Sequence, residues 1–246
     1  MEWLADPNAW IGLLTLTLLE VVLGIDNIIF ISILASKLPK EQQYAARQTG
    51  ILLALGTRIL LLFSISWLAG LSQPLFALFG FDFSGRDLVL IGGGLFLIAK
   101  ATWEIHGQLE GVEEGAPGAK LPTSFASVVA QIILIDVIFS LDSVITAVGM
   151  VDELAVMVTA VVISIGFMLF AAGPVSTFIE QHPTVKMLAL AFLVLIGVNL
   201  LAEGFGTEIE KGYTYFALAF SLGVEVLNLR TRKKPEEPVH LRKSIR

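Results

Sequence analysis

Seven long apolar segments dominate the sequence. They lie near residues 10 to 35, 46 to 70, 87 to 106, 124 to 149, 154 to 178, 185 to 203 and 212 to 229. A helix needs about 20 apolar residues to cross the roughly 30 Å hydrocarbon core of a bilayer. Because no water is present there to satisfy backbone groups, such a segment crosses as a helix. The segments therefore predict an all-α polytopic membrane protein with seven transmembrane helices.

The composition supports this class and excludes others. Hydrophobic residues make up 55% of the 246 residues and charged residues 15%, which is too little polar surface for a soluble domain. The chain has no cysteine, so disulfides, thiolate catalysis and thiolate metal sites are excluded. A formal charge of -6 argues against nucleic acid as a partner, since clustered cations bind phosphates. The acidic start lacks the basic region and cleavage site of a signal peptide, so the first segment is expected to stay as a helix.

Lysine and arginine predict the orientation, because cytoplasmic connections carry an excess of both. If the N-terminus is outside, the inner connections hold Lys37, Lys40, Arg47, Lys120 and Lys186, together with the basic tail 230–246. The outer connections then hold only Arg86 and Lys211. We therefore predict an outer N-terminus and a cytoplasmic C-terminus. The tail is interpreted as a solvated cytoplasmic anchor, with a lipid- or protein-binding switch as the alternative.

An acidic motif in the first segment recurs in the fourth. Glu20 and Asp26 match Asp136 and Asp142, each 116 residues later, and Asn27 matches Ser143 in the same register. A weaker match, 99 residues apart, pairs the stretch from 97 to 107 with the stretch from 196 to 206. We interpret these as repeat one (about 9–106), a linker (107–123) and repeat two (about 124–206), followed by a seventh helix (about 212–229) within one transmembrane domain (1–229). Three spans is an odd number, so the copies insert in opposite directions, as in many transporters.

The repeated acids predict a cation site at mid-bilayer. A central Asp costs about 2.5 to 3.5 kcal/mol on the mildest insertion scale, so intramembrane acids indicate function by default. The candidate metal ligands are Glu20, Asp26, Asn27, Asp136, Asp142 and Ser143. All of them offer oxygen, which suits Mn²⁺, Mg²⁺ or Ca²⁺, and no organic cofactor is expected. The structural alternative is that these side chains only hold helices together by hydrogen bonds.

The geometry of a helix sets a condition on this site. Six residues turn about 240° and rise about 9 Å in an unbroken helix, so Glu20 and Asp26 would not chelate one ion. Both repeats must contribute, or the helix must unwind locally, for which Gly24 and Gly149 are weak indications.

Three further polar residues in the spans are candidates for charge pairing or gating: Arg58, Lys100 and Asn199. Arg58 is interpreted as an ion-pair or gating residue. For Lys100, snorkelling of the amine to the interface is an equal alternative. The run from Gly92 to Gly94 is interpreted as a close helix-packing surface.

The two motifs, Glu20-Val-Val-Leu-Gly-Ile-Asp-Asn27 and Asp136-Val-Ile-Phe-Ser-Leu-Asp-Ser143, resemble those of the TerC family of integral membrane proteins, within the LysE-type transporter superfamily. The resemblance covers residues 10 to about 229. It implies a role in bacterial manganese export or in supplying metal to exported proteins, and assigns metal handling to the six motif residues. The family is named from tellurite resistance. This chain has Gly24 where many members have Ser, and Ile145 where many have Pro, and it looks like a membrane-only branch.

The leading hypothesis is a bacterial inner-membrane exporter of Mn²⁺ or a similar cation. Moving two charges out against the membrane potential costs about 4.6 kcal/mol per 100 mV, and no nucleotide-binding motif is present to supply it. We therefore expect coupling to protons or another cation.

The alternative is a membrane adaptor that delivers metal to partners, such as exported metalloproteins, without net transport. A homo-oligomer is also compatible with the sequence. No enzymatic activity is expected. Paired acids also occur in intramembrane aspartyl proteases, but these need a signature such as Gly-x-Gly-Asp, which the sequence lacks.

Overall fold

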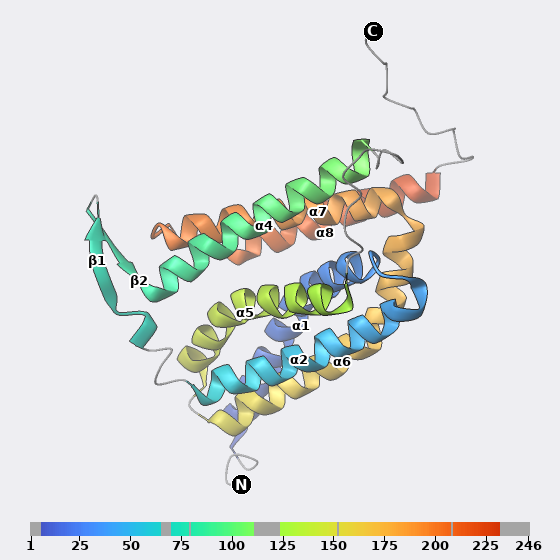
Figure 1. Ribbon diagram of the computed structural model, residues 1–246. Helices are drawn as coiled ribbons and strands as arrows, with labels where there is room; N and C mark the ends of the chain where they lie inside the picture. Colours follow the sequence, from blue (N-terminus) through green and yellow to red (C-terminus); the bar gives the residue numbers. More distant parts are fainter. Residues whose placement is uncertain are drawn as a thin grey trace.

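The computed structural model describes residues 6–64, 70–78, 80–110, 124–151, 153–207 and 209–231, and in this part of the chain seven helices and one β-hairpin follow one another (Figure 1). The helices are α1 (Pro7–Ala35), α2 (Lys40–Phe63), α4 (Gly85–Glu110), α5 (Phe125–Met150), α6 (Leu154–Gln181), α7 (Pro183–Gly204) and α8 (Lys211–Thr231). The strands are β1 (Pro74–Leu78) and β2 (Phe81–Ser84). Most of the predicted linker and of the basic tail lies outside the described residues.

Six of these helices, α1, α2, α4, α5, α6 and α7, are long and apolar enough to cross a membrane. The predicted all-α polytopic membrane fold is thus confirmed. A helix also forms at the predicted seventh segment, but α8 is not among the six, because polar residues such as Thr214, Glu225 and Asn228 interrupt its apolar stretch. Helices also extend beyond the apolar segments: α2 begins at Lys40, six residues before its predicted start.

The hairpin of β1 and β2 lies where the sequence predicted only a connection. Its strands are antiparallel, and the turn contains Gly80 with a φ of 83°, a conformation that suits glycine. The Phe83 ring stacks on Phe76 at 5.5 Å between centroids and meets Phe205, just after α7, edge-on at 6.0 Å. The hairpin is therefore packed against the end of α7.

The hairpin leads directly into a capped helix. The Ser84 hydroxyl and backbone N–H both donate to the Asp87 carboxylate, at 2.6 and 2.8 Å, and the Asp87 N–H donates back to the Ser84 hydroxyl at 3.2 Å. This reciprocal arrangement has the logic of a capping box and sets the start of α4. It thereby fixes Arg86 in the first helical turn.

The helices form two groups (Figure 1): α4, α7 and α8 lie together on one side, and α1, α2, α5 and α6 on the other. The principal pairs are α1 with α6, α2 with α5, and α4 with α7. Each pair joins a helix of one predicted copy to a helix of the other. If α1 is exchanged with α5, α2 with α6 and α4 with α7, the same three pairs result, as two related copies would give.

Glycine permits the closest of these contacts. A Cβ added to Gly94 in α4 would lie 2.6 Å from the Gly197 carbonyl oxygen in α7, and one added to Gly93 would lie 2.5 Å from Ile138 in α5. The predicted packing role is confirmed at these two glycines. It is wrong for Gly92, where a Cβ would meet nothing within 4 Å.

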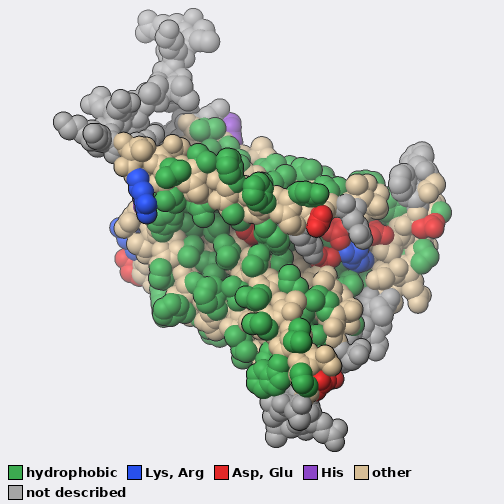
Figure 2. All heavy atoms as spheres, turned by 180° about the vertical axis from the view of Figure 1, so that it is seen from behind, with side chains coloured by type: hydrophobic (Ala, Val, Ile, Leu, Met, Phe, Trp, Pro, Cys, Tyr) green, Lys and Arg blue, Asp and Glu red, His purple; other side chains and the backbone are tan. Residues whose placement is uncertain are grey.

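The outer surface is apolar. Figure 2 shows a face on which hydrophobic side chains predominate, with acidic and basic side chains gathered mainly toward its edges. Phe170 is 81% exposed and Phe216 is 72% exposed. A surface of this kind is expected of helices in contact with lipid.

Candidate cation site

The acidic motifs lie on continuous helices. α1 runs unbroken past Glu20 and Asp26, so the structure contains no local unwinding at Gly24. Gly24 instead allows close packing on α6, since a Cβ there would lie 2.8 Å from the Met168 sulfur. α5 likewise continues past Gly149 to its end. The two acids of each helix therefore point in different directions and have different surroundings.

In the first cluster, Arg58 of α2 bridges Glu20 of α1 and Asp136 of α5. The guanidinium donates to Asp136 Oδ1 through Nε at 3.1 Å and Nη2 at 2.8 Å, and its Nη1 forms an ion pair with Glu20 Oε2. Asp136 Oδ2 accepts hydrogen bonds from the hydroxyls of Thr57 at 3.3 Å and Ser140 at 3.2 Å. The arginine thus joins the two repeat-related acids.

The side chains of this cluster are buried. Arg58 is 1% exposed, Glu20 5% and Asp136 4%. Removing one partner of such a buried pair costs about 3 to 5 kcal/mol, because it leaves an uncompensated charge. The Arg58 cluster is therefore suited to be a fixed link between α1, α2 and α5.

In the second cluster, Arg86 of α4 bridges Asp142 of α5 and Glu203 of α7. Its Nη2 donates to Asp142 Oδ1 at 2.6 Å and forms an ion pair with Glu203 Oε1. The three side chains are 21%, 11% and 17% exposed, so this cluster is more accessible than that of Arg58. The sequence analysis placed Arg86 in an outer connection, just before the third segment, and the structure places it in the first turn of α4.

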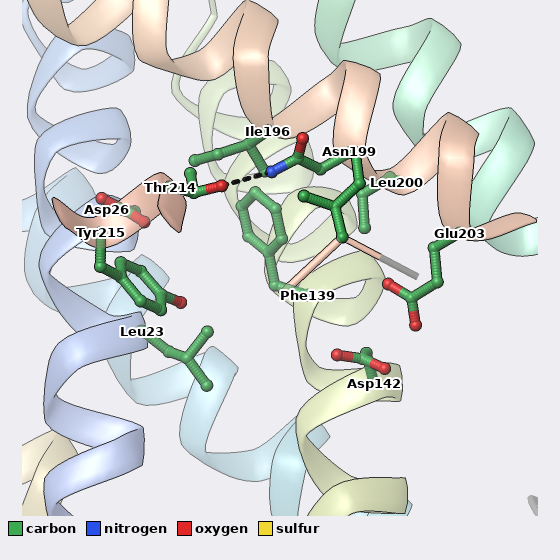
Figure 3. Close-up of a pocket in the computed structure, with 11 residues that line it drawn as sticks. Leu23, Asp26, Phe139, Asp142, Ile196, Asn199, Leu200, Glu203, Thr214 and Tyr215 are labelled. Carbon is green, nitrogen blue, oxygen red and sulfur yellow. Dashed lines mark hydrogen bonds between the residues drawn. The ribbon is translucent and has the colours of Figure 1, made fainter. Parts of the chain in front are cut away.

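A pocket lies next to the Arg86 cluster, between the two groups of helices (Figure 3). Its polar lining consists of Asp26, Asp142, Asn199, Glu203, Thr214 and Tyr215, with apolar walls that include Leu23, Phe139 and Ile196. The Asn199 amide donates to the Thr214 hydroxyl at 2.6 Å. The volume is about 70 Å³. One water needs roughly 10 to 15 Å³ on this scale, so the pocket has room for several waters or a partly hydrated ion.

A second pocket, of about 280 Å³, adjoins the first and shares Leu23 and Tyr215 with it. It is lined by Glu20 and Ser143 among other residues. Tyr215 lies within electrostatic reach of Glu20, Asp26 and Asp142. The side chain of Tyr215 therefore stands at the boundary between the two acidic regions.

The six predicted ligands do not meet at one point. Glu20 and Ser143 face one pocket, Asp26 and Asp142 face the other, and Asp136 is held by Arg58. Asn27 is 4% exposed, and neither of its amide atoms has a hydrogen-bond partner in the described part of the chain. Among the described residues, no group of three His, Cys, Asp or Glu side chains is placed to hold a metal ion.

Lys100 and Glu104 line a small cavity between α1, α4 and α7. Glu104 forms an ion pair with Lys37, in the connection after α1. Lys100 is half-buried. The side chains of Lys37 and Glu104 are 28% and 16% exposed, so their ion pair is more accessible than the Arg58 cluster.

Sequence reasoning missed four residues around the pocket: Arg86, Glu203, Thr214 and Tyr215. Glu203 carries a signal, because it is the partner of Glu104 in the weaker repeat alignment. Thr214 and Tyr215 carry none, because they lie on α8, outside both predicted copies.

The model of the family described as "Integral membrane protein TerC family" matches residues 5–237. The UPF0053 inner membrane protein YgdQ of Escherichia coli K12 is 54% identical over 234 residues, which cover 95% of this chain and 98% of YgdQ. A UPF0053 protein of Haemophilus influenzae is 52% identical over 232 residues, or 94% and 98% of the two chains.

A longer relative, the UPF0053 protein YegH of Escherichia coli K12, is 55% identical over 228 residues. The match covers 93% of this chain but 43% of YegH, so the chain spans less than half of that relative. No solved structure matches the chain.

Proposed function

Because the chain belongs to the TerC family of integral membrane proteins, we propose that it transports a hard divalent cation across the bacterial inner membrane, with Mn²⁺ as the main candidate. The observation that carries the proposal is that Asp26, Asp142 and Glu203, from three different helices, line one pocket between the two helix groups. The atoms of this pocket that could ligate a cation are carboxylate, amide and hydroxyl oxygens, which favours Mn²⁺, Mg²⁺ or Ca²⁺ over softer metals.

The charge of the pocket suits a divalent cargo. With all three acids ionised and Arg86 protonated, the formal charge of these four side chains is -2. A divalent cation would neutralise it. Since three acids do not converge on one point here, the cation would keep part of its water shell and contact some carboxylates through water, as small hard cations commonly do.

Proton exchange is the coupling that this chemistry supports. Carboxylates left without a cation in a low-dielectric site favour the protonated form, so cation release and proton uptake oppose each other. Outward transport of two charges needs such a coupling because it costs about 4.6 kcal/mol per 100 mV. We propose export in exchange for protons, with the N-terminus outside and the C-terminus in the cytoplasm.

The test uses purified protein in liposomes with an imposed pH gradient and measures Mn²⁺, Mg²⁺ and Ca²⁺ in the lumen. We expect gradient-dependent Mn²⁺ accumulation, and a drop of about tenfold or more in Asp26→Asn, because the pocket loses one of its three charges. Asp82→Asn, at an exposed position in β2, is the matched control and should transport like the parent. Binding of Mn²⁺ without accumulation would contradict transport and favour the metal-delivering adaptor.

A further inference from the structure

The pocket beside Arg86 continues along the interface between α1 and α7. It shares Asp26 and Ile196 with a narrow apolar cavity, which shares Ile33 and Leu193 with the small cavity that reaches Glu104. The three spaces thus form one line, from Glu203 at one end, past Asp26, to Glu104 at the other.

The two ends of this line are related by the internal repeat. Glu104 and Glu203 are 99 residues apart and occupy matching positions in the weaker alignment. α4 and α7 run antiparallel, since Gly204 lies against the Asp87 backbone and Gly197 against Gly94. The two glutamates therefore lie at opposite ends of the α4 and α7 pair.

Each of these glutamates is held by a cation from another element. Arg86 binds Glu203, and Lys37 binds Glu104. Both ion pairs are partly exposed, although Arg86 also binds Asp142, and solvent screens such pairs more than it screens the buried Arg58 pair. The buried Arg58 pair is different, because separating it is strongly unfavourable. The molecule thus has a partly exposed ion pair or bridge at each end and one fully buried cluster at the centre.

The middle of the line is closed to a hydrated cation. The apolar cavity is lined by residues such as Ile29, Ile33 and Phe192, and its volume is about 20 Å³, close to the space for one water. The space beside Glu104 is tighter still, with a volume of about 0 Å³, so there is no room for a water at that end. Passage from end to end therefore requires α1 and α7 to separate locally and the Glu104 end to open.

We propose that this line is the cation route and that Glu203 and Glu104 are equivalent cation-binding residues at its two mouths, with Arg86 and Lys37 holding the mouths closed in turn. The inference rests on the proposed transport function and adds the path and its two ends. Asp26 lies between the mouths as the intermediate binding residue.

The absence of cysteine from the sequence allows a direct test, because a single introduced thiol is the only one present. Ile196→Cys and Leu193→Cys place reporters at the two junctions of the line. A charged, membrane-impermeant thiol reagent is added to one side of the membrane, using right-side-out and everted vesicles. The labelling rate is then compared between the parent reporters and the same reporters carrying Lys37→Ala or Arg86→Ala.

We expect Lys37→Ala to raise the labelling rate at least about threefold from the Glu104 side and to lower it from the other side. Arg86→Ala should do the reverse. The reason is that loss of one ion pair shifts the balance between the state open at the Glu104 end and the state open at the Glu203 end. The charge swap Lys37→Glu with Glu104→Lys should restore the parent rates. Lys40→Ala, an exposed lysine nearby, is the matched control and should change nothing.

Labelling that is unchanged in both variants, or changed in the same direction from both sides, would overturn the inference. Labelling does not depend on the cargo, so the two proposals fail separately. Opposite labelling shifts without Mn²⁺ transport would leave the route intact and remove the manganese assignment. Mn²⁺ transport without labelling shifts would place the route elsewhere.

Discussion

At the scale of the residue, two arginines determine how the acids are arranged. Arg58 and Arg86 each lie between two carboxylates from different helices. The planar guanidinium suits this role because it offers donors in several fixed directions, whereas a lysine amine is a point charge. The arginines thus compensate part of the charge of four acids, two in each cluster.

The Arg58 cluster predicts a stability effect. Arg58→Ala should lower the free energy of unfolding by about 3 to 5 kcal/mol, because Glu20 and Asp136 stay buried without their cation. The measurement is thermal unfolding in detergent.

The control for this variant is Arg47→Ala, whose ion pair with the more exposed Glu180 spans 4.0 Å. It should cost much less. Adding Glu20→Gln to Arg58→Ala should recover part of the loss, since one uncompensated charge is removed. Equal unfolding temperatures for Arg58→Ala and Arg47→Ala would show that the buried cluster is not a stabilising link.

At the scale of the element, close packing of α4 on α7 brings Arg86 and Glu203 together. The contact depends on Gly94, because a Cβ there would lie 2.6 Å from a backbone oxygen that has little freedom to move. Gly94→Ala should therefore destabilise the protein by about 1 to 3 kcal/mol through overpacking.

Gly92→Ala is the matched control, two residues away on the same helix, where a Cβ would meet nothing within 4 Å. It should be neutral, or stabilising by up to about 1 kcal/mol, because alanine favours the helix over glycine. Chemical unfolding of both variants in detergent measures the difference. A destabilisation of similar size at both positions would contradict a specific contact between α4 and α7.

These elements also mark how far sequence reasoning reaches. Apolar length predicted seven spans, of which six are described helices long and apolar enough to cross a membrane, while the seventh forms the more polar α8. The β-hairpin was missed, since Pro74 begins its first strand and Gly80 lies between its two short strands, and both residues are typical of a turn or connection. The start of α4, two residues before the predicted segment, was missed with it, so Arg86 was not linked to Asp142 and Glu203.

The candidate site was predicted only in part. Repeat spacing identified the acids on α1 and α5, because the register survives in the sequence. It could not tell which acids share a pocket, since that depends on the unbroken course of α1 and on the space taken by the arginines. The contribution of Tyr215 depends on how α8 packs, and no repeat signal reports it.

At the scale of the whole molecule, the two predicted copies are interlocked. α1 packs on α6, α2 on α5, and α4 on α7, so the main contacts run between the copies. Neither copy can bury its inner faces without the other. The two halves should therefore behave as one cooperative unit despite the linker between them.

This arrangement predicts that the linker is dispensable once the protein has folded. A protease site inserted within residues 111–123 and cleaved after purification should leave the two halves associated in size-exclusion chromatography. Half 124–246 expressed alone should aggregate or be degraded, and co-expression with half 1–110 should recover it. Stable, separately folded halves would contradict the interlocked packing.

The position of α8 has a consequence for direction. The two proposed mouths are built alike, each from a glutamate held by a cation. α8 supplies Thr214 and Tyr215 to the pocket beside Glu203, and it has no equivalent in either copy. On the proposed route, α8 would therefore make the rates of inward and outward ion movement unequal.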